Sequence, residues 1–355
     1  MVTPWAFGHF LLRSQGIFAL PVGKDSTQRS VQFSGAGSAG EKPNGPPIAW
    51  FASAMGLASL GLAWRAAGAT VRVPSQIGET ILAVAALVFA TLATLYVRKA
   101  LRSPESVRKE YADPIVSSYF GTVTISLSLL AAALIPYARS AGTILWALSA
   151  TASLALLLLL LRRWVATRHD LAHITPAWFI PIVGNAVSVY AAVALGFIEV
   201  GWFLFAAALL CWLTLQPLVF YRLIFHDAIP PRLTPSLAIL VSSPAVLASA
   251  WFALEGGAAD PFFRILAFKA LFLALLVVML TKVTRRAPFS AAWWGYTFPA
   301  AALAGAFERY AEALRTPFAS GIGWTILVAA TTIVAYVSLR AVLAYARHLF
   351  HPVAL

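Results

Sequence analysis

The sequence predicts an all-α membrane protein of ten transmembrane helices, paired as five helical hairpins in a quasi-fivefold arrangement. Hydrophobic residues make up 60% of the 355-residue chain and charged residues only 11%, whereas soluble domains carry about 25% charged residues. Apolar segments near the ~20 residues that a helix needs to cross a bilayer recur along the chain. Prolines at the start of every second segment indicate a repeated hairpin. Odd-numbered helices would form an inner ring lining a central pore, and even-numbered helices an outer ring.

The chain is expected to have three parts. Residues 1–45 are rich in Gly, Ser, Pro and basic residues, which predicts a disordered or interfacial N-terminal tail. Residues 46–347 form the ten-helix transmembrane domain, and residues 348–355 form a short C-terminal tail. The single cysteine, Cys211, lies in an apolar run, so neither a disulfide framework nor a cysteine metal site is predicted.

Ten apolar segments with short connections define the predicted bundle, because short connections join neighbouring antiparallel helices. Their boundaries are read from hydropathy alone. The segments lie at 47–67, 77–97, 114–136, 141–161, 176–196, 200–221, 235–254, 262–281, 289–313 and 319–346.

The odd and even segments differ in composition. Odd segments are rich in small and hydroxyl residues and carry prolines, whereas even segments are bulkier and mostly uninterrupted. Small residues permit close packing of membrane helices, and irregular helices are tolerated where they line a cavity. The odd helices are therefore predicted to surround the lumen. A proline suits the first turn of a helix, where its missing amide costs nothing. Each odd segment starts at one: Pro47, Pro114, Pro176, Pro235 and Pro288.

The ninth segment contains Pro299 near its middle, and we expect the helix to kink or break there. Phe298 precedes this proline. The residues alone leave open whether its ring packs against a neighbouring helix or projects into the lumen. Other candidate pore-lining residues are small, hydroxyl, amide and proline residues of the odd segments. They are Gly56, Ser118, Pro181, Gly184, Asn185, Ser242, Ser243, Pro244, Thr297 and Pro299.

The net charge of +13 is interpreted as topogenic rather than as a signal for nucleic acid. Most Lys and Arg residues fall in the N-terminal tail and in the loops on its side, which predicts that both termini are cytoplasmic. The N-termini of the odd helices then face the cytoplasm and attract anions to the mouth of the pore. The basic residues assigned to the opposite side are Arg65, Arg72, Arg139, Arg264, Arg309 and Arg315.

Acidic residues are missing from the middle of every predicted span. Glu79, Glu199, Glu255, Glu308 and Glu312 all fall near the outer ends. A carrier driven by protons usually places an ionisable relay within the membrane. The sequence therefore favours passive anion permeation over proton-coupled transport.

Catalytic, metal and cofactor chemistry is not predicted. His169 and His173 have i, i+4 spacing, but no third ligand lies nearby and the stretch is next to the membrane. Lys269 is the basic residue well inside a span. It is expected to extend toward the outer interface, and an anion contact is the alternative. The chain is therefore not expected to be an enzyme.

Four stretches carry a resemblance to a known family. They read PIAWFASAMGLASLGLAW from residue 47, VRKEYADP from 107, PIVGNAVSVYAAVALG from 181, and AWWGYTFP from 292 followed by RYAEAL. The chain resembles the tellurite-resistance/dicarboxylate transporter family within the voltage-dependent anion channel superfamily. This family includes the guard-cell slow anion channels of plants, bacterial tellurite-resistance proteins and fungal malate carriers. Departures include Ala49 and Ala52, where relatives tend to have glycine.

The resemblance implies a ten-helix protomer, a homotrimer with one pore per protomer, and Phe298 as the gate that occludes the pore. We therefore expect an anion channel in a bacterial inner membrane. Its partners would be small inorganic or organic anions and the lipid bilayer, with no nucleic acid and no cofactor. The alternative is a proton-coupled carrier or exporter of C4-dicarboxylates, sulfite or tellurite-related oxyanions.

Overall fold

The computed structural model describes residues 45–70, 73–284 and 289–350. Asn44–Leu355 forms one compact unit. All but the last position of the predicted tail at residues 1–45 lies outside the described residues, as do residues 351–355 at the other end. The three-part division of the chain therefore stays a prediction.

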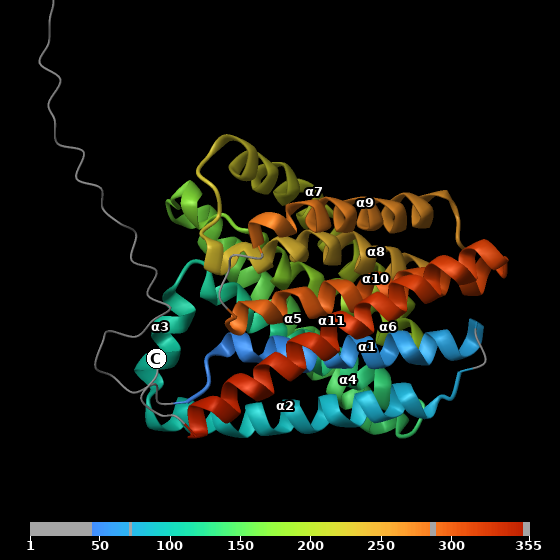
Figure 1. Ribbon diagram of the computed structural model, residues 1–355, viewed down its shortest axis with the longest axis horizontal. Helices are drawn as coiled ribbons and strands as arrows, with labels where there is room; N and C mark the ends of the chain where they lie inside the picture. The colour runs from blue at the N-terminus through green and yellow to red at the C-terminus, as the bar shows by residue number, and fades with distance from the viewer. Residues whose placement is uncertain (1–44, 71–72, 285–288, 351–355) are drawn as a thin grey trace, which may run out of the picture. The chain divides into compact units, whose positions relative to one another are not determined.

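Every element within these ranges is a helix, as the composition predicts. The α-helices are α1 (Phe51–Thr70), α2 (Gln76–Arg102), α3 (Pro104–Ala112), α4 (Phe120–Leu134), α5 (Arg139–Ala166), α6 (Ile180–Leu195), α7 (Ile198–Phe225), α8 (Ile239–Leu254), α9 (Pro261–Thr284), α10 (Thr297–Leu314) and α11 (Pro317–Phe350). The 3-10 helices are η1 (Ile48–Trp50), η2 (Val116–Tyr119), η3 (Leu171–His173), η4 (Pro176–Phe179), η5 (Pro231–Ala238) and η6 (Ala291–Tyr296). Figure 1 shows most of the long helices running in a similar direction, with α11 crossing them obliquely.

Eight of the described helices are long and apolar enough to cross a membrane, so the protein is a multi-pass membrane protein. They are α2, α4 with η2, α5, α6 with η4, α7, α8 with η5, α9 and α11. α1 and α10 are outside this group, and α10 carries Glu308, Arg309 and Glu312 in its C-terminal half. The ten-span arrangement therefore stays a prediction.

A 3-10 helix leads into each of α1, α4, α6, α8 and α10. Pro47 is the N-cap of η1, Pro176 is the first residue of η4, and Pro235 lies inside η5. Proline lacks an amide hydrogen, and 3-10 turns are frequent at helix N-termini. The predicted starts at Pro47, Pro176 and Pro235 thus coincide with tight first turns, whereas Pro114 lies in a turn two residues before η2 and Pro288 lies outside the described residues.

Pro299 does not interrupt the middle of a helix as expected. It lies in the first turn of α10, which begins at Thr297, and the residues before it form η6. An amide at this position has no partner within the helix, so proline is tolerated there. The backbone changes from 3-10 to α between Tyr296 and Thr297, one residue before Phe298.

The long helices fall into two sets by burial. The buried set is α1, α4, α6, α8 and α10, and the peripheral set is α2, α5, α7, α9 and α11. Each buried helix packs against the peripheral helix that follows it in the chain. The buried helices also pack on one another in cyclic order: α1 on α4, α4 on α6, α6 on α8, α8 on α10 and α10 on α1.

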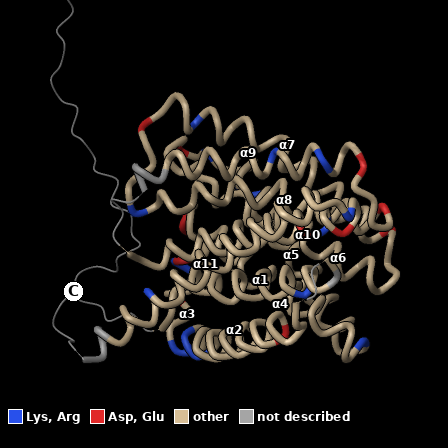
Figure 2. Tube along the Cα trace, turned by 45° about the vertical axis from the view of Figure 1, so that its right-hand side comes forward, with Lys and Arg blue, Asp and Glu red and all other residues tan. Residues whose placement is uncertain are grey.

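Figure 2 shows that most charged residues lie near the ends of the long helices, with uncharged residues along their middles. This distribution is what a bilayer requires, because a charge at its centre is costly. The middle of the bundle is therefore where an uncharged passage would run.

Candidate functional site

A small cavity lies where all five helices of the buried set meet. Its volume is about 20 Å³, which is room for about one water molecule. The lining is apolar except for hydroxyl groups and carries no charge. The lining residues are Ala52, Met55, Tyr119, Thr122, Ile125, Ile180, Val183, Ile239, Ser242, Gly295, Phe298 and Pro299.

The lining residues repeat at a spacing of three. Ala52 and Met55 come from α1, Ile180 and Val183 from α6, and Ile239 with Ser242 from α8. Residues three apart share one face of a helix and eclipse each other in a 3-10 turn. Each helix thus offers the cavity one turn near its start. This spacing is the sequence signal that could have found the apolar lining residues, which were not among the predicted candidates.

Phe298 forms part of the cavity wall and is 3% exposed. Pro299 and Ser242 line the same cavity. Gly295, one turn before Phe298, lies so close to η5 that a Cβ there would be 3.3 Å from the Pro235 carbonyl oxygen. η6, which leads into α10, is therefore tightly packed against η5. This packing holds Phe298 in place.

Gly56 and Thr297, two further candidates, touch each other rather than the cavity. A Cβ built on Gly56 would lie 2.1 Å from Thr297 Oγ1 and 2.6 Å from Thr297 Cβ. The Thr297 side chain is fully buried, and its hydroxyl donates to the Trp294 carbonyl oxygen at 2.8 Å. This contact between α1 and α10 fixes the residue directly before Phe298.

The remaining candidates lie in helices of the buried set, or in the 3-10 helix before α4, but outside the cavity lining. Asn185 Nδ2 donates to the Pro181 carbonyl oxygen at 3.0 Å. Gly184 faces α5, where a Cβ would be 2.5 Å from Ser153 Oγ. The others are buried within η2 or α8: Ser118, Ser243 and Pro244. Their assignment to the pore stays a prediction.

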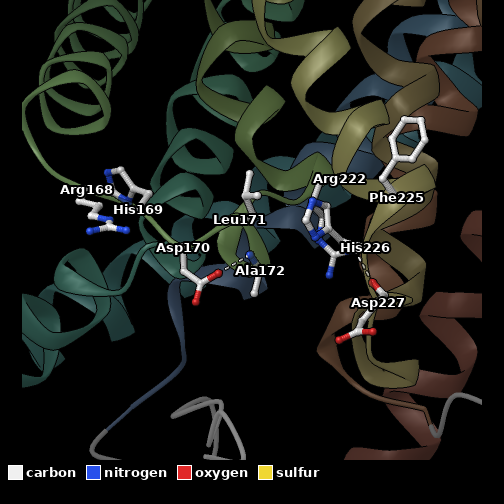
Figure 3. Close-up of a pocket in the computed structure, with 9 residues that line it drawn as sticks. All are labelled: Arg168, His169, Asp170, Leu171, Ala172, Arg222, Phe225, His226 and Asp227. Atoms are coloured by element: carbon white, nitrogen blue, oxygen red, sulfur yellow. Dashed lines mark hydrogen bonds between the residues drawn. The ribbon is translucent and has the colours of Figure 1, made fainter. Parts of the chain in front are cut away.

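A larger cavity of about 880 Å³ lies beside the connections that follow α5 and α7. Figure 3 shows Arg168 and His169 on one side of it, and Arg222, His226 and Asp227 on the other. Arg222 Nη1 donates to the Asp227 carbonyl oxygen at 2.6 Å, which ties the turn after α7 to the helix. This cavity is wide, its arginines are balanced by aspartates, and its lining includes no residue of the buried set. We therefore place the candidate site at the small cavity.

Metal chemistry finds no support in the part of the chain that the structure describes, where no three His, Cys, Asp or Glu side chains gather. His169 Nε2 lies 3.0 Å from Thr167 Oγ1, and its ring meets the edge of Trp178. Lys269 Nζ lies 4.3 Å from the centre of the Trp212 ring. It therefore contacts α7 in the peripheral set.

Comparison with known proteins identifies relatives of the chain. The family model described as SLAC1, voltage-dependent anion channel, matches residues 46–342. The S-type anion channel SLAH3 of Arabidopsis thaliana is 28% identical over 298 residues, which are 82% of this chain and 47% of that protein. The guard cell S-type anion channel SLAC1 of the same plant is 25% identical over 279 residues, 76% of this chain and 50% of that protein.

A bacterial relative is also similar. The tellurite resistance protein TehA homolog of Haemophilus influenzae is 23% identical over 227 residues, 63% of this chain and 69% of that protein. The match spans about half the length of the two plant proteins. The family model nevertheless covers most of the chain, and the described helices fit a multi-pass membrane protein. The chain belongs to the voltage-dependent anion channel family.

Proposed function

We propose that the chain is an anion channel whose pore runs between the helices of the buried set and is closed at Phe298. The observation that carries this proposal is the water-sized cavity at the meeting point of the five helices, with Phe298 in its wall. In this proposal the cyclic packing of the buried set is a quasi-fivefold ring, and α1 and α10 cross the membrane with the other eight helices. The candidate pore-lining residues that are buried outside the cavity line the same pore when it opens.

The chemistry of the path suits weak passage of anions. The cavity lining is uncharged, so an anion meets no opposite charge that would hold it there. The N-termini of the five buried helices lie at one end, because each is followed by an antiparallel partner. Each N-terminus carries roughly half a positive charge. Anions are thereby drawn to one mouth of a pore whose narrow part is uncharged.

The orientation follows from the loops. Basic residues are concentrated in the connection around α3 and in the other connections at that end. The positive-inside rule then places this end, with both chain termini, in the cytoplasm of a bacterial cell. The exposed apolar side chains of the peripheral set face lipid and the neighbouring subunits of a homotrimer, with one pore in each protomer.

The gate is tested by the currents of purified protein in planar bilayers. The cavity admits about one water, so the wild type is expected to pass little anion current. Phe298→Ala removes the ring from the wall, and lowering the barrier by only about 1.4 kcal/mol raises the current about tenfold. Phe307→Ala, on the same helix but fully buried away from the cavity, is the matched control and is expected to leave the current low. Equal, negligible currents from the two variants would remove Phe298 from the gate.

The second candidate is a proton-coupled carrier of C4-dicarboxylates, sulfite or tellurite-related oxyanions, and Glu308 favours it. This carboxyl group is only 1% exposed, and Thr70 Oγ1 donates to its Oε2 at 2.8 Å. An ionisable group buried inside a transmembrane bundle is a candidate functional site. Saturable malate uptake into proteoliposomes, driven by a pH gradient and lost in Glu308→Gln, would support the carrier. Uptake that is linear in concentration and indifferent to the gradient would support the channel.

A further inference from the structure

Arg309 lies on the same face of α10 as Phe298. The two residues are about three helical turns apart, which is about 16 Å along the axis. Gly305 lies between them on this face, and Arg309 Nη1 donates to the Gly305 carbonyl oxygen at 3.0 Å. The side chain therefore runs back along α10 toward the cavity instead of extending away from the bundle.

The guanidinium group of Arg309 reaches a different helix of the buried set. Its central carbon lies 5.2 Å from the centre of the Tyr190 ring on α6. The Tyr190 hydroxyl donates to the Val246 carbonyl oxygen of α8 at 3.0 Å. α6 and α10 both pack against α8. The Arg309 side chain therefore crosses in front of α8, on the side where the buried helices face one another.

Tyr190 belongs to the same face of α6 as the cavity. It follows Val183, a lining residue, by about two helical turns, so the two side chains point in similar directions. Arg309 and Tyr190 thus lie on the continuation of the proposed pore, between the cavity and the C-terminal ends of the buried helices. The positive-inside rule makes this the outer half of the pore.

Among the residues that the structure describes, no carboxylate forms an ion pair with Arg309. The ion pairs among the described residues are Arg65 with Glu79 and Lys99 with Glu110. A guanidinium has five N–H donors, and within the described part of the chain one hydrogen bond from Arg309 to protein is found. The Tyr190 ring stabilises the cation without using a donor. Most of the N–H groups are thus left for a ligand.

We propose that Arg309, held by Tyr190, forms an anion subsite in the outer half of the pore that takes small monovalent inorganic anions. This rests on the proposed channel function and names the ions it passes. One guanidinium, spread partly over an aromatic face, balances a single negative charge. A dicarboxylate or sulfite dianion would leave one charge uncompensated in a half-buried site, which is costly.

The transport experiment uses the Phe298→Ala background, in which the pore conducts. Losing a hydrogen bond to a charged group weakens anion binding by about tenfold or more. Arg309→Gln is therefore expected to lower the chloride and nitrate conductance several-fold and to reduce the selectivity over potassium in reversal-potential measurements. Arg309→Lys should keep part of both. The control is Arg264→Gln, an exposed arginine of α9 at the same end, and it should change neither.

A binding experiment separates this proposal from the channel function. Bromide is added to purified wild type, Arg309→Gln and Arg264→Gln, and the thermal unfolding temperature is followed. Wild type and Arg264→Gln are expected to be stabilised as bromide rises, and Arg309→Gln is not. Bromide stabilisation that depends on Arg309 supports the subsite even if Phe298→Ala passes no current. Anion currents and bromide shifts that are both unchanged in Arg309→Gln overturn the subsite and leave the channel proposal standing.

Tyr190 is tested as a positioning residue. Tyr190→Phe keeps the ring under the guanidinium and loses only the hydrogen bond to α8, so selectivity should stay close to that of the background. Tyr190→Leu removes the aromatic face, so selectivity should fall toward that of Arg309→Gln. Equal selectivity in the two Tyr190 variants would overturn the role of the ring.

Discussion

In the most apolar stretches of α6 and α8, 83% of the residues are buried, whereas the shares in α2 and α11 are 17% and 22%. The exposed residues of the peripheral set are large and apolar, such as Leu87 and Met279. The buried set carries many buried serine, threonine and alanine residues among its larger apolar side chains. Because lipid is as apolar as leucine, burial in a membrane favours close packing and hydrogen bonding over hydrophobicity. This difference predicts that similar substitutions change the free energy of unfolding differently in the buried set and in the peripheral set.

The largest loss of stability is expected at Lys99. This residue is an exception to the comparison, because it is a buried charge on a peripheral helix. It is 4% exposed, and its Nζ lies 2.7 Å from Glu110 Oε1 on α3 and 3.1 Å from the Pro46 carbonyl oxygen. Lys99→Met leaves Glu110 without its cation and is expected to cost about 3–5 kcal/mol. Unfolding of the purified protein in detergent, followed by circular dichroism, measures this loss.

Two further variants make the Lys99 result specific. Arg65→Met breaks the pair with Glu79, whose side chains are 24% and 33% exposed, and is expected to cost about 1 kcal/mol or less. Lys99→Met combined with Glu110→Leu removes both charges and should recover most of the stability. If Lys99→Met were no more costly than Arg65→Met, burial would not set the cost of breaking an ion pair in this bundle.

A medium effect is expected where two helices of the buried set approach closely. Gly56→Ala places a methyl group against Thr297 and is expected to cost about 1–3 kcal/mol through overpacking. Gly68, on the same helix, has open space where a Cβ would lie, with no neighbouring atom within 4 Å, so Gly68→Ala should be neutral or stabilise by up to about 1 kcal/mol. Thermal unfolding of both variants gives the comparison. Similar shifts in the same direction would show that the contact with α10 does not constrain α1.

Much of this arrangement could be predicted from the sequence, because composition and periodicity report on the environment of whole helices. The buried set coincides with the odd segments, and the proline starts mark its 3-10 turns. Ser242, Phe298 and Pro299 are predicted pore residues that do line the cavity. Counting small and hydroxyl residues along a segment does not show which face of the helix each residue occupies. Gly56 and Gly184 are therefore predicted to line the pore, although their nearest contacts are neighbouring helices.

Arg309 shows that sequence position also fails to predict which side chains surround a charged residue. Its place near the end of a segment assigns it to the outer side, and nothing in the local sequence links it to Tyr190. The contact exists because α6 and α10 both pack on α8.

Pro299 is a different case, because hydropathy cannot tell a 3-10 helix from an α-helix. The apolar segment is therefore predicted as one helix, which puts a first-turn proline in its middle.

The smallest effect is expected from the hydroxyl groups that join α4, α5 and α6. Ser128 Oγ lies 2.9 Å from both Ser149 Oγ and Ser188 Oγ, and all three side chains are fully buried. Interhelical hydrogen bonds in membranes contribute about 0.6 kcal/mol on average and at most about 1.7 kcal/mol. Ser128→Ala should lower the free energy of unfolding by an amount in this range. The control Thr214→Val removes an exposed hydroxyl that bonds only within α7, to the Leu210 carbonyl oxygen, and should change stability little. A larger loss in Thr214→Val would mean that hydroxyl groups stabilise the peripheral set instead.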